Sequence, residues 1–435
     1  MALGKDCRCA IMKRVLIVSY LFEPQNAIGA VRPSKLAKYL SEDGYSVDVF
    51  TTSEGLNCME AQNKTYRIIY DNPINAKSET ARASVPQSKG AKRKVDSAFV
   101  HEIKMAYRQM GVLRQGFTFR KKLVEAIKEQ RISIDNYDCV FTTFGPVGSL
   151  LCGMMLKSMK PGIQWINDFR DPMVSDIMPK LFAPYYGYLQ NISISKCDIV
   201  TTVSNGYKKR MIKKRYEDKC AVIPNGYDDT DASFNQKMQD DGLLTFAYAG
   251  ALYEGKRDLS ELFSMLHSLI ESGEIEKEKV RFHYAGGSYE FLKQQAEKCH
   301  MEDTIINHGV VSRRESLMIQ KQAKILVLST WNDRGEEGVF PGKLIEYMQM
   351  KKPIFSVVNG KLAGSEVSET IAKYSLGVSF EEADLGSRET AIEWLKSSIH
   401  QYNSTGEIPF LGDTAQIDEQ YNWKNIVKRF ERLMV

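Results

Sequence analysis

Short apolar runs rich in β-branched residues alternate with stretches of helical periodicity along the first half of the chain. These runs lack regular polar alternation, which is typical of parallel strands covered on both faces. The first helix is expected to begin at Pro33, a favoured first-turn residue, and to end at Gly44, a natural C-cap. We expect strands at residues 15–20, 45–51, 66–70, 138–144, 164–168, 197–203 and 220–224.

A polar, turn-rich stretch at residues 229–242 interrupts this pattern, and the pattern then restarts. The expected strands of the second half are residues 243–250, 280–287, 305–311, 323–330, 353–358 and 376–380. Two successive arrays around a linker predict two Rossmann-like, doubly wound α/β domains, residues 1–228 and 243–420. The length of 435 residues fits this prediction, because a single core seldom grows so large.

Composition narrows the class of protein further. Hydrophobic residues make up 43% and charged residues 26%, which is ordinary for a globular chain. No apolar run reaches the roughly 18 residues of a membrane span, and residues 1–14 lack the apolar core of a secretory signal. The eight cysteines show no zinc-binding spacing, so we interpret them as reduced thiols in a cytoplasmic protein.

Ligands of parallel sheets bind beyond the carboxyl ends of strands, which directs attention to the loops there. Gly29 follows the first expected strand, where the backbone could approach a phosphate at a helix start. A plain turn between strand and helix explains Gly29 equally well. No G-x-G-x-x-G motif occurs at this point, which argues against a dinucleotide-dependent dehydrogenase.

The segment at residues 339–355 carries a stronger signal. A Pro341-Gly342 step before a helix leaves first-turn N–H groups unpaired and able to receive an anion. Lys343 opposes the helix dipole there, and a bound phosphate would reverse that unfavourable effect. Glu346 lies one turn further on the same side, placed to accept hydrogen bonds from ribose hydroxyls. The alternative is an ordinary solvated helix carboxylate.

Three segments together resemble glycosyltransferase family 4: residues 29–51, the Asn-Gly-Tyr-Asp at 225–228, and the run at 341–354. The resemblance implies a GT-B fold, in which the two domains face each other across a central cleft. It also implies that the helix at 421–435 crosses back onto the first domain. The implied activity is transfer of a sugar, with retention of configuration, from a nucleotide-diphosphate donor to a saccharide or lipid-linked acceptor. The activity would contribute to the synthesis of a cell-surface polysaccharide or another glycan.

The resemblance also implies roles for particular residues. Gly342 and Lys343 would contact the diphosphate, with Gly29, Gly250 and Pro341 close by, and Glu346 would bind the ribose. His308, Gly309 and Val310 would meet the base. No metal or other cofactor is implied, because basic residues and helix ends would stabilise the departing diphosphate.

The chain departs from the family where an Arg commonly follows the glycine of the first strand in the second domain. Here Ala251 follows Gly250, and the next basic residues are Lys256 and Arg257. We predict that these two, or Arg334 in the loop before Pro341, stabilise the leaving group. The alternative is a solvated basic loop without catalytic role.

Residues 165–172 end a strand with three ionisable groups, Asp168, Arg170 and Asp171. Either carboxylate could orient or deprotonate an acceptor hydroxyl, or bind the donor sugar. Alternatively, Arg170 pairs with a carboxylate and fixes the loop. The acceptor side is predicted to include Arg32, Thr143, Gly145 and Arg170.

Residues 82–131 hold thirteen Lys or Arg and four Asp or Glu, a local net charge of +9. Apolar residues from Phe99 to Phe117 recur at helical spacing, with basic residues beside them. We favour packing of this apolar stripe on the domain, with the basic residues solvated. The alternative is docking on an anionic membrane, which would place the protein on its inner face. No nucleic-acid-binding motif accompanies the charge, so nucleic acid is not a predicted partner.

The sequence leaves two alternatives to a transferase open. One is a nucleotide-sugar epimerase of the same fold, which would consume no acceptor. The other is a non-catalytic module that binds a nucleotide sugar, an alternative kept open by Ala251.

Overall fold

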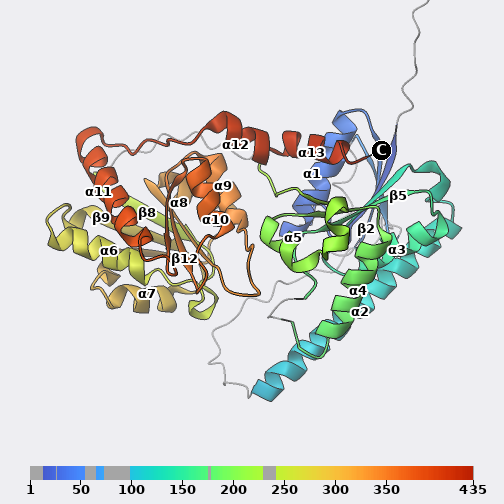
Figure 1. The fold of residues 1–435 in the computed structure, drawn as a ribbon, viewed down its shortest axis with the longest axis horizontal. Coiled ribbons are helices and arrows are strands. Elements are labelled where there is room, and N and C mark those ends of the chain that lie inside the picture. Colours follow the sequence, from blue (N-terminus) through green and yellow to red (C-terminus); the bar gives the residue numbers. More distant parts are fainter. Residues whose placement is uncertain are drawn as a thin grey trace, which may run out of the picture. The chain divides into compact units, whose positions relative to one another are not determined.

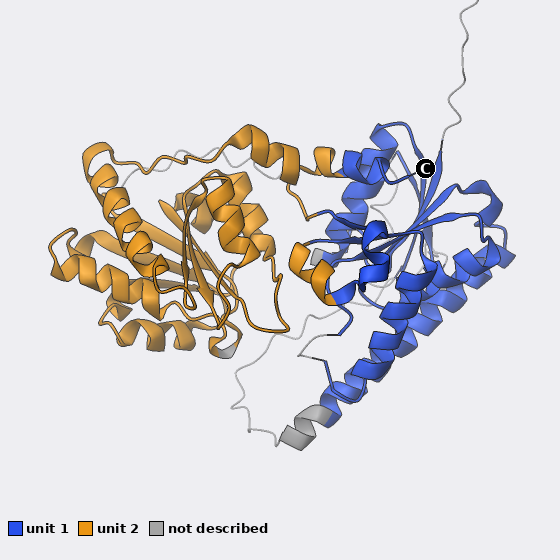
Figure 2. Ribbon diagram, in the orientation of Figure 1, with its two compact units in different colours: residues 1–203, 211–223, 427–435 blue, residues 204–210, 224–426 orange. Residues whose placement is uncertain are grey.

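The structure, a computed structural model, describes residues 13–25, 27–53, 65–72, 98–174, 178–228 and 242–434. It divides into two compact units, shown in Figure 2. Unit 1 comprises residues 1–203, 211–223 and 427–435, and unit 2 comprises residues 204–210 and 224–426. Most of the expected linker at 229–242, and residues 82–97 of the basic segment, lie outside the described residues.

The described part of unit 1 forms a seven-stranded parallel sheet in the order β3-β2-β1-β4-β5-β6-β7 (Figure 1). Its central strands are buried on both faces, as their continuous apolar sequences predict. The strands are β1 (Arg14–Val18), β2 (Ser46–Thr51), β3 (Arg67–Tyr70), β4 (Cys139–Thr143), β5 (Gln164–Phe169), β6 (Ile199–Thr202) and β7 (Cys220–Val222).

Helices accompany this sheet, and α2, α3 and α4 pack side by side. The last helix of the chain, α13, returns to unit 1, because residues 427–435 belong to that unit. The helices are α1 (Ile28–Glu42), α2 (Ala98–Lys128), α3 (Gly148–Met159), α4 (Ala183–Lys196) and α13 (Trp423–Glu431). Helix α5 (Asn205–Met211) follows β6 in the chain, but its residues up to Arg210 belong to unit 2.

Helix α1 begins five residues before the expected start at Pro33. Pro33 lies inside the helix and cannot donate to the carbonyl of Gly29. The extra turn is stabilised by packing, since Ala30 is 2% exposed and Arg32 is 1% exposed. Gly29 therefore lies in the first turn of α1 and not in a preceding loop.

The described part of unit 2 forms a six-stranded parallel sheet in the order β10-β9-β8-β11-β12-β13. The strands are β8 (Leu244–Ala249), β9 (Val280–Ala285), β10 (Ile305–Gly309), β11 (Ile325–Trp331), β12 (Ile354–Asn359) and β13 (Gly377–Glu381). The helices are α6 (Ser260–Glu271), α7 (Tyr289–Glu297), α8 (Arg313–Gln322), α9 (Gly342–Met350), α10 (Glu366–Lys373), α11 (Ser387–Thr405) and α12 (Thr414–Tyr421). Every strand expected from the sequence is thus present.

Each sheet has a point where the strand order reverses, the usual position of a ligand crevice in such folds. In unit 1 it lies between β1 and β4, and in unit 2 between β8 and β11. The loops after these strands carry six of the predicted site residues: Gly145, Gly250, Lys256, Arg257, Arg334 and Pro341. Within the described residues, no helix combines the length and apolarity needed to cross a membrane.

Candidate active site

The predicted donor site lies at the carboxyl edge of the unit 2 sheet. Strand β8 continues into Gly250, whose φ of +142° favours glycine. Two buried tyrosines hold this turn in place. Tyr284 donates a hydrogen bond to the Gly250 carbonyl at 2.9 Å, and Tyr248 donates one to the Ala251 carbonyl at 3.0 Å.

Lys343 extends across this turn from the start of α9. A Cβ atom at position 250 would lie 2.8 Å from Lys343 Cε, so only glycine leaves room for the lysine. The ammonium group makes no hydrogen bond or ion pair within the described residues. Burial, the largest cause, lowers the pKa of Lys343; Arg257 and Arg313 lower it further, and Glu346 opposes them.

The start of α9 adds to this positive field. Its N-cap residue, Pro341, offers no side-chain cap, and the first turn contains no acidic residue. The first backbone N–H groups therefore lack the partners that a capping side chain would supply. A partly buried cation beside an uncapped helix start forms a site suited to an anion such as a diphosphate.

Arg257 joins Lys343 at this turn, and Lys256 lies beside it. Arg257 Nη1 donates hydrogen bonds of 3.2 Å to both the Tyr248 hydroxyl and the Ala251 carbonyl. Its guanidinium carbon lies 5.5 Å from the Trp331 ring centroid. Lys256 forms an ion pair with Glu336 at 2.7 Å, so a carboxylate already balances its charge. Of the two, Arg257 is the better placed to act on a diphosphate.

The remaining residues of the predicted donor site are spread along the same edge. Glu346 is mostly buried, with 16% of its side chain exposed, and lies 3.9 Å from Arg313. His308 stacks on His283, with their ring nitrogens 3.0 Å apart, and Val310 is 85% exposed. Gly309, between them, has a φ of +67°. Arg334 is exposed, and no contact within the described residues links it to the Gly250 turn.

Tyr248, Tyr284 and Trp331 were not predicted as site residues from the sequence. Tyr248 and Tyr284 stack with ring centroids 6.2 Å apart and fix the glycine turn through their hydroxyls. The signal was available, because Tyr-Ala-Gly occurs at the ends of both β8 and β9. Adjacent parallel strands bring such repeated residues together.

In unit 1, Asp168 is fully buried at the end of β5 and completely engaged. It forms an ion pair with Arg32, 2.9 Å from Nη2, and accepts hydrogen bonds from Thr143 and Thr201. Arg32 is itself 1% exposed and also donates to the Ile223 carbonyl. A carboxylate enclosed in this way has no free edge for an acceptor hydroxyl, so its geometry favours a structural role.

Arg170, by contrast, pairs with neither neighbouring carboxylate. Its guanidinium lies between Gly29 and Gly145, with Nη1 2.8 Å and Nη2 2.5 Å from where Cβ atoms would stand at those positions. Its one hydrogen bond within the described residues goes from Nη2 to the Phe144 carbonyl at 3.0 Å. Asp171 is exposed, although the protein around it raises the pKa of its carboxyl, chiefly by desolvation. The structure thus brings Gly29, Gly145 and Arg170 together.

The expected packing of the apolar stripe on α2 is wrong for most of its length. Ile103, Met110 and Phe117 are 54%, 61% and 45% exposed, and Tyr107 beside them is 79% exposed. The helix instead buries the face of Gly116 and Phe119, because Gly116 and Gly148 of α3 approach within 3.1 Å of each other's would-be Cβ positions. Contact between two glycines lets these helices pack closely and so selects the buried face.

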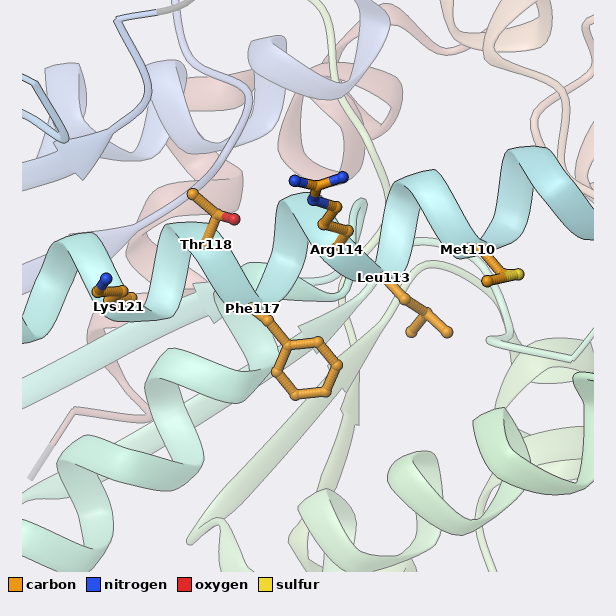
Figure 3. Close-up of a pocket in the computed structure, with 6 residues that line it drawn as sticks. All are labelled: Met110, Leu113, Arg114, Phe117, Thr118 and Lys121. Carbon is orange, nitrogen blue, oxygen red and sulfur yellow. The ribbon is translucent and has the colours of Figure 1, made fainter.

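The exposed face of α2 contains a shallow hollow of about 490 Å³ (Figure 3). Phe117 and Leu113 extend to one side of the helix, and Arg114 and Thr118 extend to the other. Between residues 103 and 124 the helix carries basic but no acidic residues. An apolar stripe bordered by cations therefore faces solvent.

Comparison with known proteins agrees with the fold. A glycosyltransferase from Rickettsia africae matches with a TM-score of 0.58 at 16% identity, covering 98% of both chains. The lipopolysaccharide outer core galactosyltransferase WaaB matches at 0.54 and 14% identity, over 96% of this chain and 98% of its own. A trehalose-6-phosphate protein from E. coli, bound with UDP-2-fluoro glucose, matches at 0.59 and 10% identity, over 97% and 99%. No curated protein matches the sequence.

These likenesses define the class: the chain has the GT-B fold of the glycosyltransferases. Residues 34–231 match the family described as Glycosyltransferase Family 4. The resemblance predicted from the sequence is thus confirmed over these residues.

Proposed function

We propose that the chain is a retaining glycosyltransferase that uses a nucleotide-diphosphate sugar. One observation carries the proposal: the Lys343 ammonium lies over Gly250 beside the uncapped start of α9, with no hydrogen bond or ion pair among the described residues. A donor diphosphate would supply the missing negative charge. The neighbour bound with UDP-2-fluoro glucose, which shares the fold, supports a donor of this chemical type.

In the proposed reaction, the oxygen of an acceptor hydroxyl attacks the anomeric carbon on the face that the diphosphate leaves. The bond from that carbon to the phosphate oxygen breaks, and the hydroxyl proton passes to the departing diphosphate. Lys343 and Arg257 stabilise the charge that develops there, a contribution that in other enzymes is worth about 10²–10³ in rate per donor group. Glu346 accepts hydrogen bonds from the ribose. Metal independence stays a prediction that follows from these cations.

Product analysis tests the proposal. The purified protein is incubated with UDP-, GDP-, ADP- and CMP-linked sugars, with and without a mixture of saccharide and lipid-linked acceptors. We expect nucleoside diphosphate to be released only when an acceptor is present, and the new bond to keep the donor's anomeric configuration by NMR. Conversion of the donor sugar without acceptor would establish an epimerase, and binding without turnover would establish a sensor module.

We also propose that the exposed face of α2 docks on an anionic membrane surface. The stripe of Ile103, Tyr107, Met110 and Phe117 would enter the headgroup region, where tyrosine is favoured. Lys104, Arg108, Arg114 and Lys121 are exposed beside it and carry the charge that anionic lipid attracts. Each basic residue near such a surface contributes about 1 kcal/mol. This position would suit a lipid-linked acceptor.

Vesicle sedimentation tests the docking surface. We expect the protein to bind vesicles containing phosphatidylglycerol and not vesicles of phosphatidylcholine alone. Arg114→Glu with Lys121→Glu should abolish binding, and Tyr107→Ser with Met110→Ser should weaken it. As a matched control, Lys298→Glu with Lys361→Glu changes the charge equally at exposed positions of unit 2. Equal loss of binding in the control would mean that net charge, and not α2, drives the association.

A further inference from the structure

Helix α9 begins without a capping side chain, but an aromatic contact holds the residue before its N-cap. Phe340, directly before Pro341, stacks on Tyr421 at the end of α12, with ring centroids 6.2 Å apart and planes 10° from parallel. Tyr421 is 7% exposed, and Tyr374 packs edge-on against it at 5.8 Å. Such pairs fix the relative positions of aromatic side chains. The start of α9 is therefore attached to the C-terminal segment of the chain.

The Asn-Gly-Tyr-Asp motif at residues 225–228 also holds Tyr421 in place. The Tyr227 N–H donates a hydrogen bond to the Tyr421 carbonyl at 2.9 Å, and the Tyr227 carbonyl accepts one from the Trp423 N–H at 3.0 Å. A Cβ atom at Gly226 would lie 2.5 Å from the Tyr421 carbonyl oxygen, so glycine permits this close approach. The motif and the end of α12 therefore form one hydrogen-bonded block.

The same motif contacts α9 directly. The Asp228 carbonyl accepts a hydrogen bond of 2.6 Å from Gln349 Nε2, near the end of α9. Both ends of this helix are thus tied to one block, the start through the ring pair of Phe340 and Tyr421 and the end through Gln349.

The block lies where the chain enters and leaves unit 2. The longer part of unit 2 is residues 224–426, so the motif follows its first residue, and Tyr421 precedes its last by five positions. Both backbone connections from these points to unit 1 therefore begin at residues that also hold α9. A displacement of either connection would reach the start of α9 through side chains in contact.

We propose that Tyr421 is a positioning residue for the donor site. Through Phe340 it orients the start of α9 with Lys343, and it couples ligand binding there to both backbone connections between the units. Because such coupling is reciprocal, a ligand at α9 should in turn restrain residues 225–228 and 421–423. The nature of the ligand, a nucleoside diphosphate, rests on the proposed function, whereas the aromatic contact does not.

Calorimetric titration of the full chain with UDP, GDP and ADP tests the positioning role. Tyr421→Leu keeps an apolar side chain but removes the ring, and should weaken binding of the nucleotide by about fivefold, in line with the strength of one aromatic pair. Tyr421→Phe keeps the ring and should retain the affinity of the wild type. Phe340→Leu should reproduce the loss, and the double variant should lose no more than either single variant, because both remove the same contact.

Tyr402→Leu is the matched control for a loss of stability. Tyr402, in α11, is 6% exposed, much like Tyr421, but it packs in a hydrophobic cluster of unit 2 that contains no residue of α9. Both leucine variants should lower the thermal midpoint, and only Tyr421→Leu should lower the nucleotide affinity. Equal losses of affinity in these two variants, or no loss in Tyr421→Leu, would overturn the proposal.

Hydrogen exchange followed by mass spectrometry tests the contact without a ligand. In the ligand-free protein, amides of residues 339–346 should exchange faster in Tyr421→Leu than in the wild type, Tyr421→Phe or Tyr402→Leu. Unchanged exchange there would overturn the positioning role.

The same measurement with bound nucleotide tests the coupling. Protection should extend from α9 to residues 225–228 in the wild type but not in Tyr421→Leu. Protection confined to α9 in the wild type would overturn the coupling. Should no nucleotide bind the wild type while the ligand-free difference at residues 339–346 persists, the proposed function fails and the positioning of α9 by Tyr421 stands.

Discussion

The carboxyl edges of the two sheets each hold a cation withdrawn from solvent, fully for Arg32 and partly for Lys343, but the two differ in their partners. In unit 1, Arg32 and Asp168 neutralise each other completely, with Thr143 and Thr201 satisfying the remaining oxygen positions. In unit 2, Lys343 is partly enclosed beside Arg257 and an uncapped helix start; Glu346 offsets part of its charge, but no ion pair forms among the described residues. The charges of the first arrangement are satisfied within the fold, whereas the second arrangement could accommodate an anion. Burial of a charge therefore indicates function only when its partners are known.

The largest expected effect comes from breaking the neutralised pair. Asp168→Asn leaves the Arg32 guanidinium buried without its counter-charge, which should lower the free energy of unfolding by about 3–5 kcal/mol. Chemical denaturation followed by circular dichroism measures this loss. Glu129→Gln, which removes the exposed partner of Arg131, should cost less than about 1 kcal/mol. A stable Asp168→Asn protein that had lost only turnover would instead return Asp168 to the catalytic role.

At Lys343, in contrast to Asp168, a substitution that removes the charge is expected to stabilise the ligand-free protein. Lys343→Met removes a desolvated cation, so the ligand-free protein should melt at a higher temperature than the wild type. The same change should lower kcat/KM for the donor by about a hundredfold, since it removes a group that stabilises the leaving diphosphate. Steady-state kinetics and thermal melting measure the two effects on one preparation.

Lys352 provides the matched control for Lys343. Burial also lowers its pKa, but its Nζ donates to the Ala323 carbonyl at 2.7 Å, away from the Gly250 turn. Lys352→Met should leave donor kinetics unchanged. If both variants lose activity equally, the effect of Lys343 reflects the fold and not the donor.

A smaller effect, on the pH dependence of stability, is expected at Glu431, which lies near the carboxylate of Asp43. Burial, and next the nearby carboxylate of Asp43 at the end of α1, raise the pKa of Glu431 on α13 from 4.5 to about 7. The native state then holds the proton to higher pH than the unfolded chain does. Its stabilising effect is complete below pH ~4.5 and is lost as pH rises through ~7.

Glu431→Gln should remove this pH dependence. Thermal midpoints measured from pH 4.5 to 7.5 should fall less steeply in the variant than in the wild type. Because the carboxylate is partly exposed, we expect the difference to stay below about 1 kcal/mol. Parallel curves for the two proteins would mean that Glu431 titrates normally.

The sequence predicted the strands well, because each strand depends on local pattern, whereas the roles of the donor-side residues stay predictions. Parallel strands are continuous apolar runs, and the uncapped Pro341-Gly342 start with its lysine is readable within one turn. The start of α1 was placed too late, because packing of Ala30 and Arg32 continues the helix across Pro33.

Partners that are distant in the chain could not be predicted in the same way. Arg32 and Asp168 are 136 positions apart, so nothing in the sequence indicated that they neutralise each other. The buried face of α2 was predicted from apolar periodicity, but the contact between Gly116 and Gly148 decides it. Pairing and close approach are properties of the assembled sheet and helices.

The most direct test of the donor site is thermal stabilisation by UDP, GDP, ADP and CMP. At a hundredfold excess over its dissociation constant, the correct nucleotide should add about 2.7 kcal/mol to the wild type. We expect one nucleoside diphosphate to raise the thermal midpoint of the wild type and of Lys352→Met, but not of Lys343→Met or Glu346→Ala. Equal stabilisation of all four proteins would contradict the assignment of the site to the Gly250 turn and α9.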